Sequence, residues 1–143
     1  MKIPAKTEYS LKALLALAGH YGDGRVLALS KIANDHAIPE KFLLQLMLKL
    51  KHEKLVKSFR GVSGGYILAK KPEEIRVKDI IEAVDEAFFD HMSLGKRAVP
   101  QIDAAVTAIW KKLNETVDSY FSEMTLQDIL DDVIKPESVI YNI

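Results

Sequence analysis

The chain has 143 residues and a mass of 16.0 kDa, which fits one domain with at most an added oligomerisation element and excludes a large multi-domain enzyme. Apolar residues make up 48% and charged residues 28%, which is typical of a globular chain and not of a disordered or membrane-embedded one. The chain contains no cysteine, so disulfides, a thiolate nucleophile and sulfur-ligated metal sites are excluded.

The net charge of zero conceals an asymmetry between the two parts of the chain. Residues 1–80 hold 15 basic and 8 acidic side chains, a net charge of +7, whereas residues 81–143 hold 5 and 12, a net charge of −7. Within residues 41–71 there are eight basic residues and a single acid, Glu53. The first part therefore suits a polyanionic partner, and the second does not.

The apolar run of residues 13–18 resembles part of an export signal, but Glu8 and Lys12 interrupt the segment. The uninterrupted run of about six residues is shorter than the seven to fifteen that such a signal needs. No other stretch approaches the roughly eighteen apolar residues of a membrane span. The sequence therefore predicts a cytoplasmic protein without membrane contact.

Hydrophobic periodicity predicts three helices before residue 55. The first, about residues 8–21, takes Thr7 as its N-cap and ends at Gly22-Asp23-Gly24. A short second helix spans about residues 29–36, and Pro39 begins a third that reaches about residue 54. A short helix joined by a tight turn to a long amphipathic one is the helix-turn-helix pattern, whose later helix enters the major groove of DNA.

The third helix has two distinct faces. Its inward face carries Phe42, Leu43, Leu46, Met47 and Leu50. The opposite face carries Lys41, Leu44, Gln45, Leu48 and His52, with Lys49 at its edge. Gln45 offers the donor and acceptor that grip adenine, and the lysines reach phosphates or guanine. The alternative is an ordinary solvated face. Leu44 and Leu48 argue against that alternative, since they can touch thymine methyl groups or be covered by another part of a dimer.

A basic hairpin follows the third helix. Residues 55–59 and 66–69 read as strands, and the segment between them, Arg60-Gly61-Val62-Ser63-Gly64-Gly65, is rich enough in glycine for a tight turn. A helix-turn-helix with such a hairpin is a winged helix. Arg60 suits a narrow minor groove, while Ser63, Gly64 and Gly65 offer backbone amides to phosphate. The alternative is a hairpin turn without a DNA contact.

The acidic part of the chain predicts an oligomerisation element. A fourth helix, about residues 77–86, precedes a loop at 87–99, and Pro100 begins a helix of about 22 residues, or about 33 Å. Its near-heptad seam predicts a homodimer and consists of Ile102, Val106, Ile109, Leu113, Val117 and Tyr120. Thr125 is the predicted cap of a final short helix. The fold expected is a mainly α winged helix-turn-helix, with residues 1–86 as the DNA-binding domain and 87–143 as loop, dimerisation helix and tail.

The histidines do not indicate a catalytic or metal site. His20, His36 and His52 are scattered, and Asp90-His91 is the one close carboxylate–imidazole pair in the acidic part. A structural zinc needs four ligands, and catalysis needs a nucleophile or a phosphate cradle that this loop lacks. We therefore expect no catalytic residue, no metal ligand and no enzymatic activity.

Several segments together resemble the Rrf-two family of bacterial transcription regulators. They are Lys2-Ile3, Lys6, Tyr9-Ser10-Leu11, Ala13-Leu14, Ile32-Ala33, residues 38–46, Arg60 to Tyr66 and Val77 to Asp85. The resemblance is strong over about residues 1–86 and looser beyond. It implies a homodimer whose long helices cross between subunits, with the third helix in a major groove and the wing in a minor groove.

The resemblance implies that Gln45 is the base-reading glutamine and Arg60 the wing arginine, and Lys2 and Lys6 join the expected DNA contacts. Lys41 stands where members commonly have serine, and Leu44 where many have glutamate, so the target sequences of relatives do not transfer to this chain. Val62-Ser63 also replaces the proline-glycine that many members carry in the turn.

Sensor members of the family hold an iron–sulfur cluster with three cysteines in the loop at 87–99, and this chain has none. It therefore resembles the cluster-free branch, which includes a repressor of cysteine metabolism that responds through a partner enzyme. The apolar ending Val139-Ile140-Tyr141 is similar to that branch. No cofactor is expected, and a protein or small molecule remains possible as the effector.

The sequence thus predicts a transcription regulator that binds double-stranded DNA as a homodimer, and we favour a repressor over an activator. One alternative is a winged-helix interaction module that uses the basic surface, or Leu44 and Leu48, to bind a protein and not DNA. Another is a regulator gated by a small molecule or a metal at Asp90-His91. The operator, the regulated genes and the effector stay open.

Overall fold

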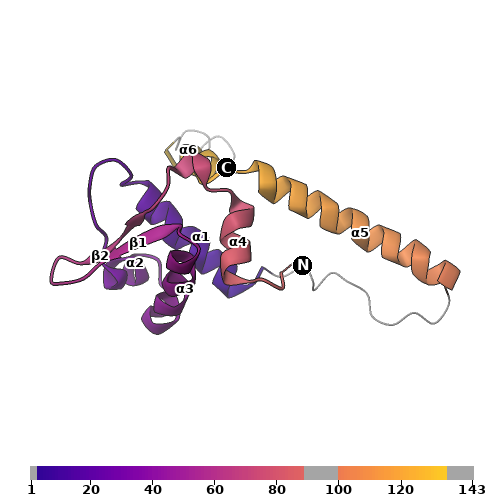
Figure 1. Ribbon diagram of the computed structural model, residues 1–143, viewed down its shortest axis with the longest axis horizontal. Helices are drawn as coiled ribbons and strands as arrows, with labels where there is room; N and C mark the ends of the chain where they lie inside the picture. The colour runs from indigo at the N-terminus through magenta and orange to yellow at the C-terminus, as the bar shows by residue number, and fades with distance from the viewer. Residues whose placement is uncertain (1–2, 89–99, 135–143) are drawn as a thin grey trace, which may run out of the picture.

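The computed structural model describes residues 3–88 and 100–134. In chain order they form α1 (Ala5–Ala18), α2 (Leu29–Asp35), α3 (Glu40–His52), β1 (Val56–Phe59), β2 (Gly65–Leu68), the 3-10 helix η1 (Pro72–Glu74), α4 (Val77–Val84), α5 (Pro100–Glu123) and α6 (Leu126–Ile134) (Figure 1). This is the mainly helical winged helix-turn-helix that the sequence predicts. None of the described helices combines the length and the apolar character needed to cross a membrane.

The core lies around α1, which contacts α3, α4, α6 and β2. From α1 it receives Ala13, Leu14 and Leu17, each at most 2% exposed. The inward face of α3 contributes Leu43, Leu46, Met47 and Leu50, also at most 2% exposed. Burial of each leucine contributes roughly 1.5–3 kcal/mol, so this contact holds α3 firmly and leaves its opposite face outside.

The first helix begins earlier than predicted, and the assignment of Thr7 as its N-cap is wrong. Pro4 precedes the helix with φ −60° and ψ 140°, and its carbonyl accepts from the amides of Thr7 (3.1 Å) and Glu8 (3.2 Å). Thr7 lies inside the first turn, is 3% exposed and packs into the core. Pro4 is thus the N-cap, with extended backbone and a carbonyl that accepts the first helical hydrogen bonds, and the helix begins at Ala5.

The turn between α2 and α3 is a Schellman motif built without glycine. Ala37 has a positive φ of 52°, and the amide of Ile38 donates to the carbonyl of Ala33 at 2.9 Å. Ile38 is buried and anchors the turn. Helix α3 ends in the same way, since Lys54 has φ 61° and the amide of Leu55 donates to the carbonyl of Leu50 at 2.9 Å. Backbone hydrogen bonds therefore close both helices of the helix-turn-helix at their C-terminal ends.

The wing is an antiparallel hairpin that packs against α1 and against the segment before α2. Val56 pairs with Leu68, and Phe59 pairs with Gly65. Leu27 and Tyr66 form an additional bridge, with N–H to carbonyl distances of 3.1 and 2.8 Å. This bridge attaches β2 to the segment before α2 and so holds the wing against the helical body.

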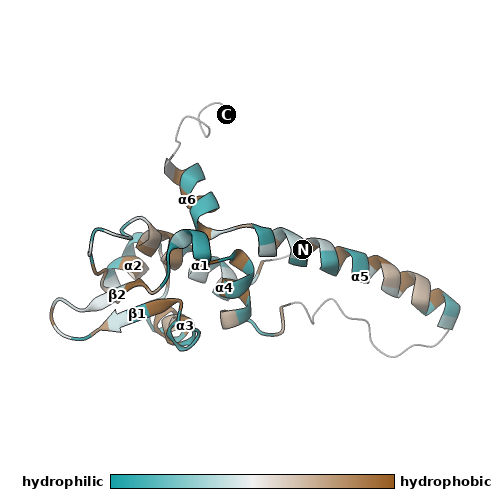
Figure 2. Ribbon diagram, turned by 45° about the horizontal axis from the view of Figure 1, so that its top comes forward, coloured by the Kyte–Doolittle hydropathy of each residue, from teal (hydrophilic) through white to brown (hydrophobic). Residues whose placement is uncertain are grey.

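Helix α5 has 24 residues and projects from the body, with its C-terminal end beside α4 and α6 (Figure 1). At that end Lys78 Nζ lies 2.7 Å from Asp118 Oδ1, and this hydrogen bond raises the pKa of Lys78. Hydrophobic positions recur along α5 out to its distal part (Figure 2). The helix contains no fully buried residue, and several of its large apolar side chains are exposed in the described chain.

After α5 the chain returns to the body. The amide of Val77 donates to the carbonyl of Met124 (2.9 Å), and that of Leu126 donates to Ile75 (2.8 Å). The predicted cap of α6 is confirmed, because Thr125 Oγ1 accepts from the Asp128 amide at 3.1 Å and Asp128 Oδ2 accepts from the Thr125 amide at 2.9 Å. Leu126 is fully buried and joins the core shared with α1 and α4.

Candidate nucleic-acid interface

The outward face of α3 carries the side chains that the sequence predicts for DNA contact. Lys41, Gln45 and Lys49 are all exposed, and so is His52 at the end of the helix. Four of the five inward residues are buried and Phe42 is half-buried against the core, so the predicted division of α3 into a core face and an outer face is confirmed. The outer face offers two ammonium groups and one amide, which matches phosphate and base-edge chemistry.

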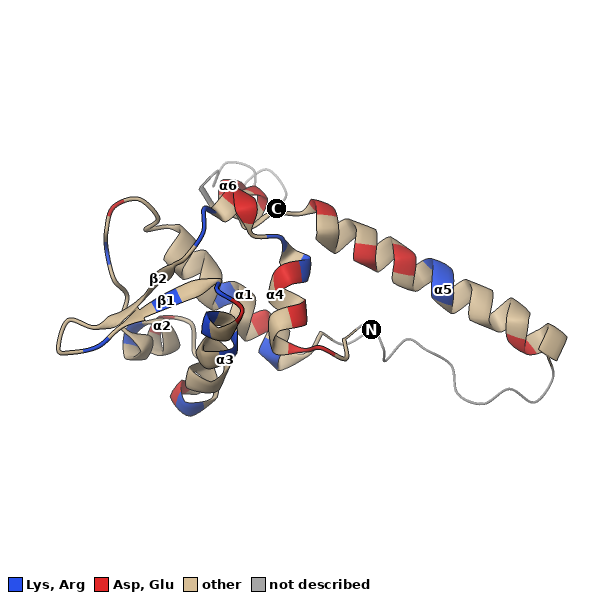
Figure 3. Cartoon of the chain, in the orientation of Figure 1, with Lys and Arg blue, Asp and Glu red and all other residues tan. Residues whose placement is uncertain are grey.

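More basic residues surround this face than the sequence assigned to the site. Lys51, Lys54, Lys57 and Lys70 line a shallow hollow at the edge of β1, whose apolar floor includes Phe59. Basic residues lie over α3 and β1, whereas acidic residues recur along α5 and α6 (Figure 3). The excess of lysine in residues 41–71 was the signal for this extended surface, but sequence spacing alone did not show that these four residues come together.

The wing turn keeps two of its four predicted contact residues exposed. Arg60 and Ser63 are exposed, whereas the amide of Gly64 donates to the carbonyl of Gly61 at 3.0 Å and serves the turn itself. Gly65 is buried, because its α-carbon lies against the Leu27 carbonyl so closely that a side chain would collide with it. The structure thus uses Gly64 and Gly65 to shape and dock the wing, and presents Arg60 and Ser63 outward.

Lys6 lies beside the α3 face but already has a partner. Its ammonium is 3.4 Å from Asp85 Oδ1, a carboxylate that is only 5% exposed at the end of α4. Lys6, Lys49 and Asp85 line one hollow, so Lys6 adds positive charge near Lys49 while it also neutralises Asp85. Lys2 and the pair Asp90-His91 lie outside the described residues.

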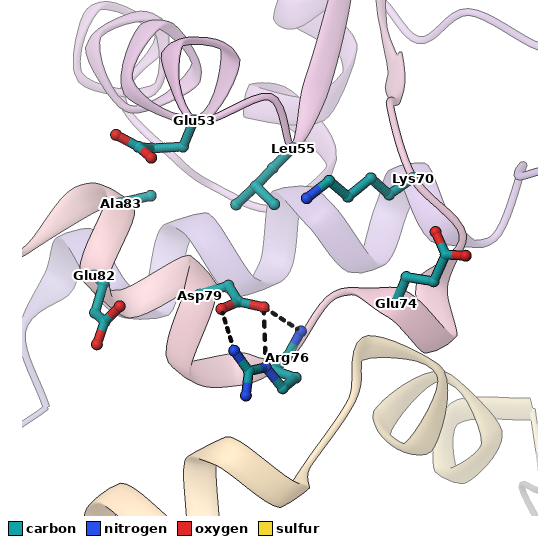
Figure 4. A pocket seen from close by; sticks show the side chains of 8 residues that line it. All are labelled: Glu53, Leu55, Lys70, Glu74, Arg76, Asp79, Glu82 and Ala83. Carbon is teal, nitrogen blue, oxygen red and sulfur yellow. Dashed lines mark hydrogen bonds and ion pairs between the residues drawn. The ribbon is translucent and has the colours of Figure 1, made fainter.

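A hollow of mixed charge borders the basic surface between the end of α3, the segment after β2, and α4 (Figure 4). Arg76 donates to Asp79 from Nε (3.3 Å), Nη2 (3.1 Å) and its backbone amide (3.1 Å), and this hydrogen bonding raises the pKa of Arg76. Glu53, Glu74 and Glu82 also line the hollow. Its acidic excess is unfavourable for phosphate, so the hollow marks a limit of the DNA-facing surface.

The seam predicted for dimerisation is exposed over much of α5. Ile102 and Ile109 are each 63% exposed, Tyr120 is 58% and Val106 is 38%, whereas Leu113 and Val117 are half-buried. Such a row of large apolar side chains is unusual for a face in contact with water alone.

The described residues contain no group of three or more His, Cys, Asp or Glu side chains that could hold a metal ion. A cluster held by cysteine thiolates does not fit this chain at all, because the whole sequence lacks cysteine.

A helix-turn-helix with a lysine- and glutamine-bearing second helix, followed by a basic wing, defines a winged helix-turn-helix DNA-binding protein. The chain belongs to the Rrf2 family, whose model carries the description "iron-dependent transcriptional regulator" and matches residues 3–132. It is therefore a DNA-binding transcriptional regulator and not an enzyme.

Individual relatives agree with this assignment. The chain is 34% identical over 131 residues to the HTH-type transcriptional regulator IscR of Yersinia enterocolitica, covering 91% of this chain and 79% of that protein. The structure of CymR, the global cysteine regulator of B. subtilis, is similar with a TM-score of 0.76 and 29% identity, covering 92% of this chain and 97% of that one. The T. potens IscR structure has a TM-score of 0.76 and 33% identity, covering 93% and 88%.

Proposed function

We propose that this protein represses transcription as a homodimer that binds a pseudo-palindromic DNA site, with each α3 in a major groove and each wing in the adjacent minor groove. The observation that carries the proposal is the exposed outer face of α3, which presents Lys41, Gln45 and Lys49, together with the exposed Arg60 of the wing. Schellman motifs end both α2 and α3, and the buried inner face of α3 packs on the core, so these side chains are presented from a helix that is held in place.

Affinity and specificity come from different residues in this proposal. The lysines of residues 41–71 neutralise phosphates and release counterions, which supplies most of the affinity and makes it strongly dependent on salt. Gln45 reads a base edge, and Arg60 reads the width and potential of the minor groove. Lys2 and Lys6 add phosphate contacts at the start of the chain.

The dimer is supported by the seam on α5. Its exposed apolar side chains follow one another at near-heptad spacing, which suits a second helix of the same kind. A second copy of the chain is the partner that a self-complementary seam fits, and it places two reading heads on one duplex.

The proposal assigns no cofactor to the protein and locates it in the cytoplasm, where it meets DNA. Since cysteine ligation is impossible, a protein or small-molecule effector takes the place of an iron–sulfur cluster as the signal.

Sedimentation velocity and a DNA titration test this proposal. At micromolar concentration we expect a dimer, and we expect it to bind random duplex at low salt. Between about 50 and 200 mM salt the affinity falls by roughly a thousandfold or more, as for proteins with six or more phosphate contacts. A monomer that ignores duplex DNA even at 50 mM salt would contradict the proposal and favour a protein-interaction module.

A further inference from the structure

Two leucines stand on the polar outer face of α3. Leu48 is 55% exposed and Leu44 is 42% exposed. The apolar residues on the inward side are at most 2% exposed: Leu43, Leu46, Met47 and Leu50. The core therefore takes its apolar side chains from α3 without using Leu44 or Leu48. The folded chain therefore gains little burial energy from these two side chains, which leaves them available to contact a partner.

Leu48 lies within the outer face of α3, among the side chains proposed to contact DNA. At about 100° per residue, Leu48 is about 20° from Lys41 and about 60° from Gln45 around the helix axis. Leu44 lies about 40° further toward the core side, which agrees with its lower exposure. A partner that contacts Gln45 and Lys41 therefore contacts Leu48 as well.

The charges around Leu48 select the partner. Lys41, Lys49 and the neighbouring Lys51 and Lys54 give this surface a positive potential, which suits a polyanion and disfavours a purely apolar protein surface. In the major groove of DNA, base pairs offer hydrogen-bond donors and acceptors and one apolar group, the C5-methyl of thymine. An aliphatic side chain in that groove has no other group to match.

We propose that Leu48, with Leu44 beside it, reads thymine methyl groups in the major groove and so adds an apolar determinant to the target sequence. This inference rests on the proposed DNA-binding function of α3. Leucine opposite a guanine or cytosine edge leaves a donor or acceptor dehydrated without a partner, so the same contact also disfavours G·C pairs there. The two leucines lie about 6 Å apart along the helix, or about two base-pair steps, so we expect two thymine positions about two steps apart.

Replacement of thymine by deoxyuridine tests the inference, because uracil keeps the hydrogen-bonding groups and lacks only the methyl. Duplexes that the dimer selects from genomic DNA are remade with deoxyuridine at one half-site position at a time. We expect the wild-type protein to bind about fourfold more weakly at one or two positions, which is the effect of one buried methyl group. Leu48→Ala is expected to bind thymine and deoxyuridine equally at one of them.

Lys49→Ala serves as the matched control on the same face. It should bind all duplexes more weakly while keeping the preference for thymine over deoxyuridine. Thermal unfolding is measured to check that the variants are folded; because Leu48 is exposed, its truncation should leave the melting temperature nearly unchanged. If the wild-type protein binds the duplexes but no position responds to loss of the methyl, or if Leu48→Ala keeps the whole response, the inference is wrong and DNA binding stands. If no duplex is bound at all, the proposed function fails with it.

Discussion

Single residues in the wing and in α3 have different expected roles even though both are exposed. Arg60 carries a planar guanidinium at the end of β1, whereas Lys49 carries a point charge on α3. A guanidinium in a narrow minor groove depends on the sequence that shapes the groove, whereas an ammonium on a phosphate does not. The two residues can therefore be separated by experiment.

We expect Arg60→Ala to weaken binding to a specific site by about 1–3 kcal/mol and to relax its sequence preference. Lys49→Ala should instead weaken all sequences alike and reduce the slope of log K against log salt by about one. Both are measured by fluorescence anisotropy over a range of salt concentrations. An operator affinity unchanged by Arg60→Ala would show that the wing does not contact DNA.

At several residues the structure shows a backbone role that the residue type does not reveal. Thr7 has the chemistry of an N-cap, but burial against the core places it inside α1. Gly64 and Gly65 have amides that suit phosphate, yet one closes the turn and the other packs on Leu27. Lys54 adopts a positive φ, although lysine, unlike glycine, has no preference for that conformation. Each outcome depends on the hydrogen bonds and packing of the folded backbone, with partners that are nearby for Gly64 and Lys54 and distant for Gly65, and the residue type alone does not reveal them.

At the scale of elements, α6 is the clearest case of a segment whose role depends on packing. It follows the projecting α5 but returns to the body, where Leu126 is fully buried and Leu130 is 9% exposed. The Thr125–Asp128 capping box starts the helix, and the amide of its first residue, Leu126, donates to the carbonyl of Ile75. The stability of the winged-helix body therefore depends on a helix from the far end of the chain.

We expect Leu126→Ala to lower the free energy of unfolding by about 2–5 kcal/mol, since it leaves a cavity in the core. Val133→Ala is the control on the same helix: Val133 is 63% exposed, and its truncation should change stability by no more than about 0.5 kcal/mol. Urea denaturation followed by circular dichroism measures both. Equal effects of the two substitutions would mean that α6 does not belong to the core.

At the scale of the whole molecule, charge and shape divide the protein in the same way. Basic residues outnumber acidic ones over α3 and β1, and acidic residues outnumber basic ones along α5 and α6, although α4 also carries acidic side chains and α5 carries Lys111 and Lys112 (Figure 3). The projecting α5 therefore carries acidic side chains, which disfavour contact with DNA phosphates, and an exposed apolar seam whose burial would be favourable. This separation favours one end of the molecule for DNA and the other for a second subunit.

We expect Ile109→Glu to shift the protein toward monomer, because a carboxylate replaces a side chain that is 63% exposed in the single chain and that the proposed dimer buries. The variant should lose affinity for a two-half-site duplex while it keeps its weaker binding to a single half-site. Sedimentation velocity and paired duplex titrations measure this, with Glu115→Gln on the same helix as the control. A dimer that survives Ile109→Glu would place the interface elsewhere.

The sequence by itself determined the order and type of the helices and strands, the two faces of α3, and the charge asymmetry, because periodicity and composition are local properties of the chain. Only the tertiary structure decided that α6 completes the core, that Lys6 pairs with Asp85, and that four lysines gather beside β1. Those features depend on which surfaces meet when distant segments pack, and no local pattern encodes that choice.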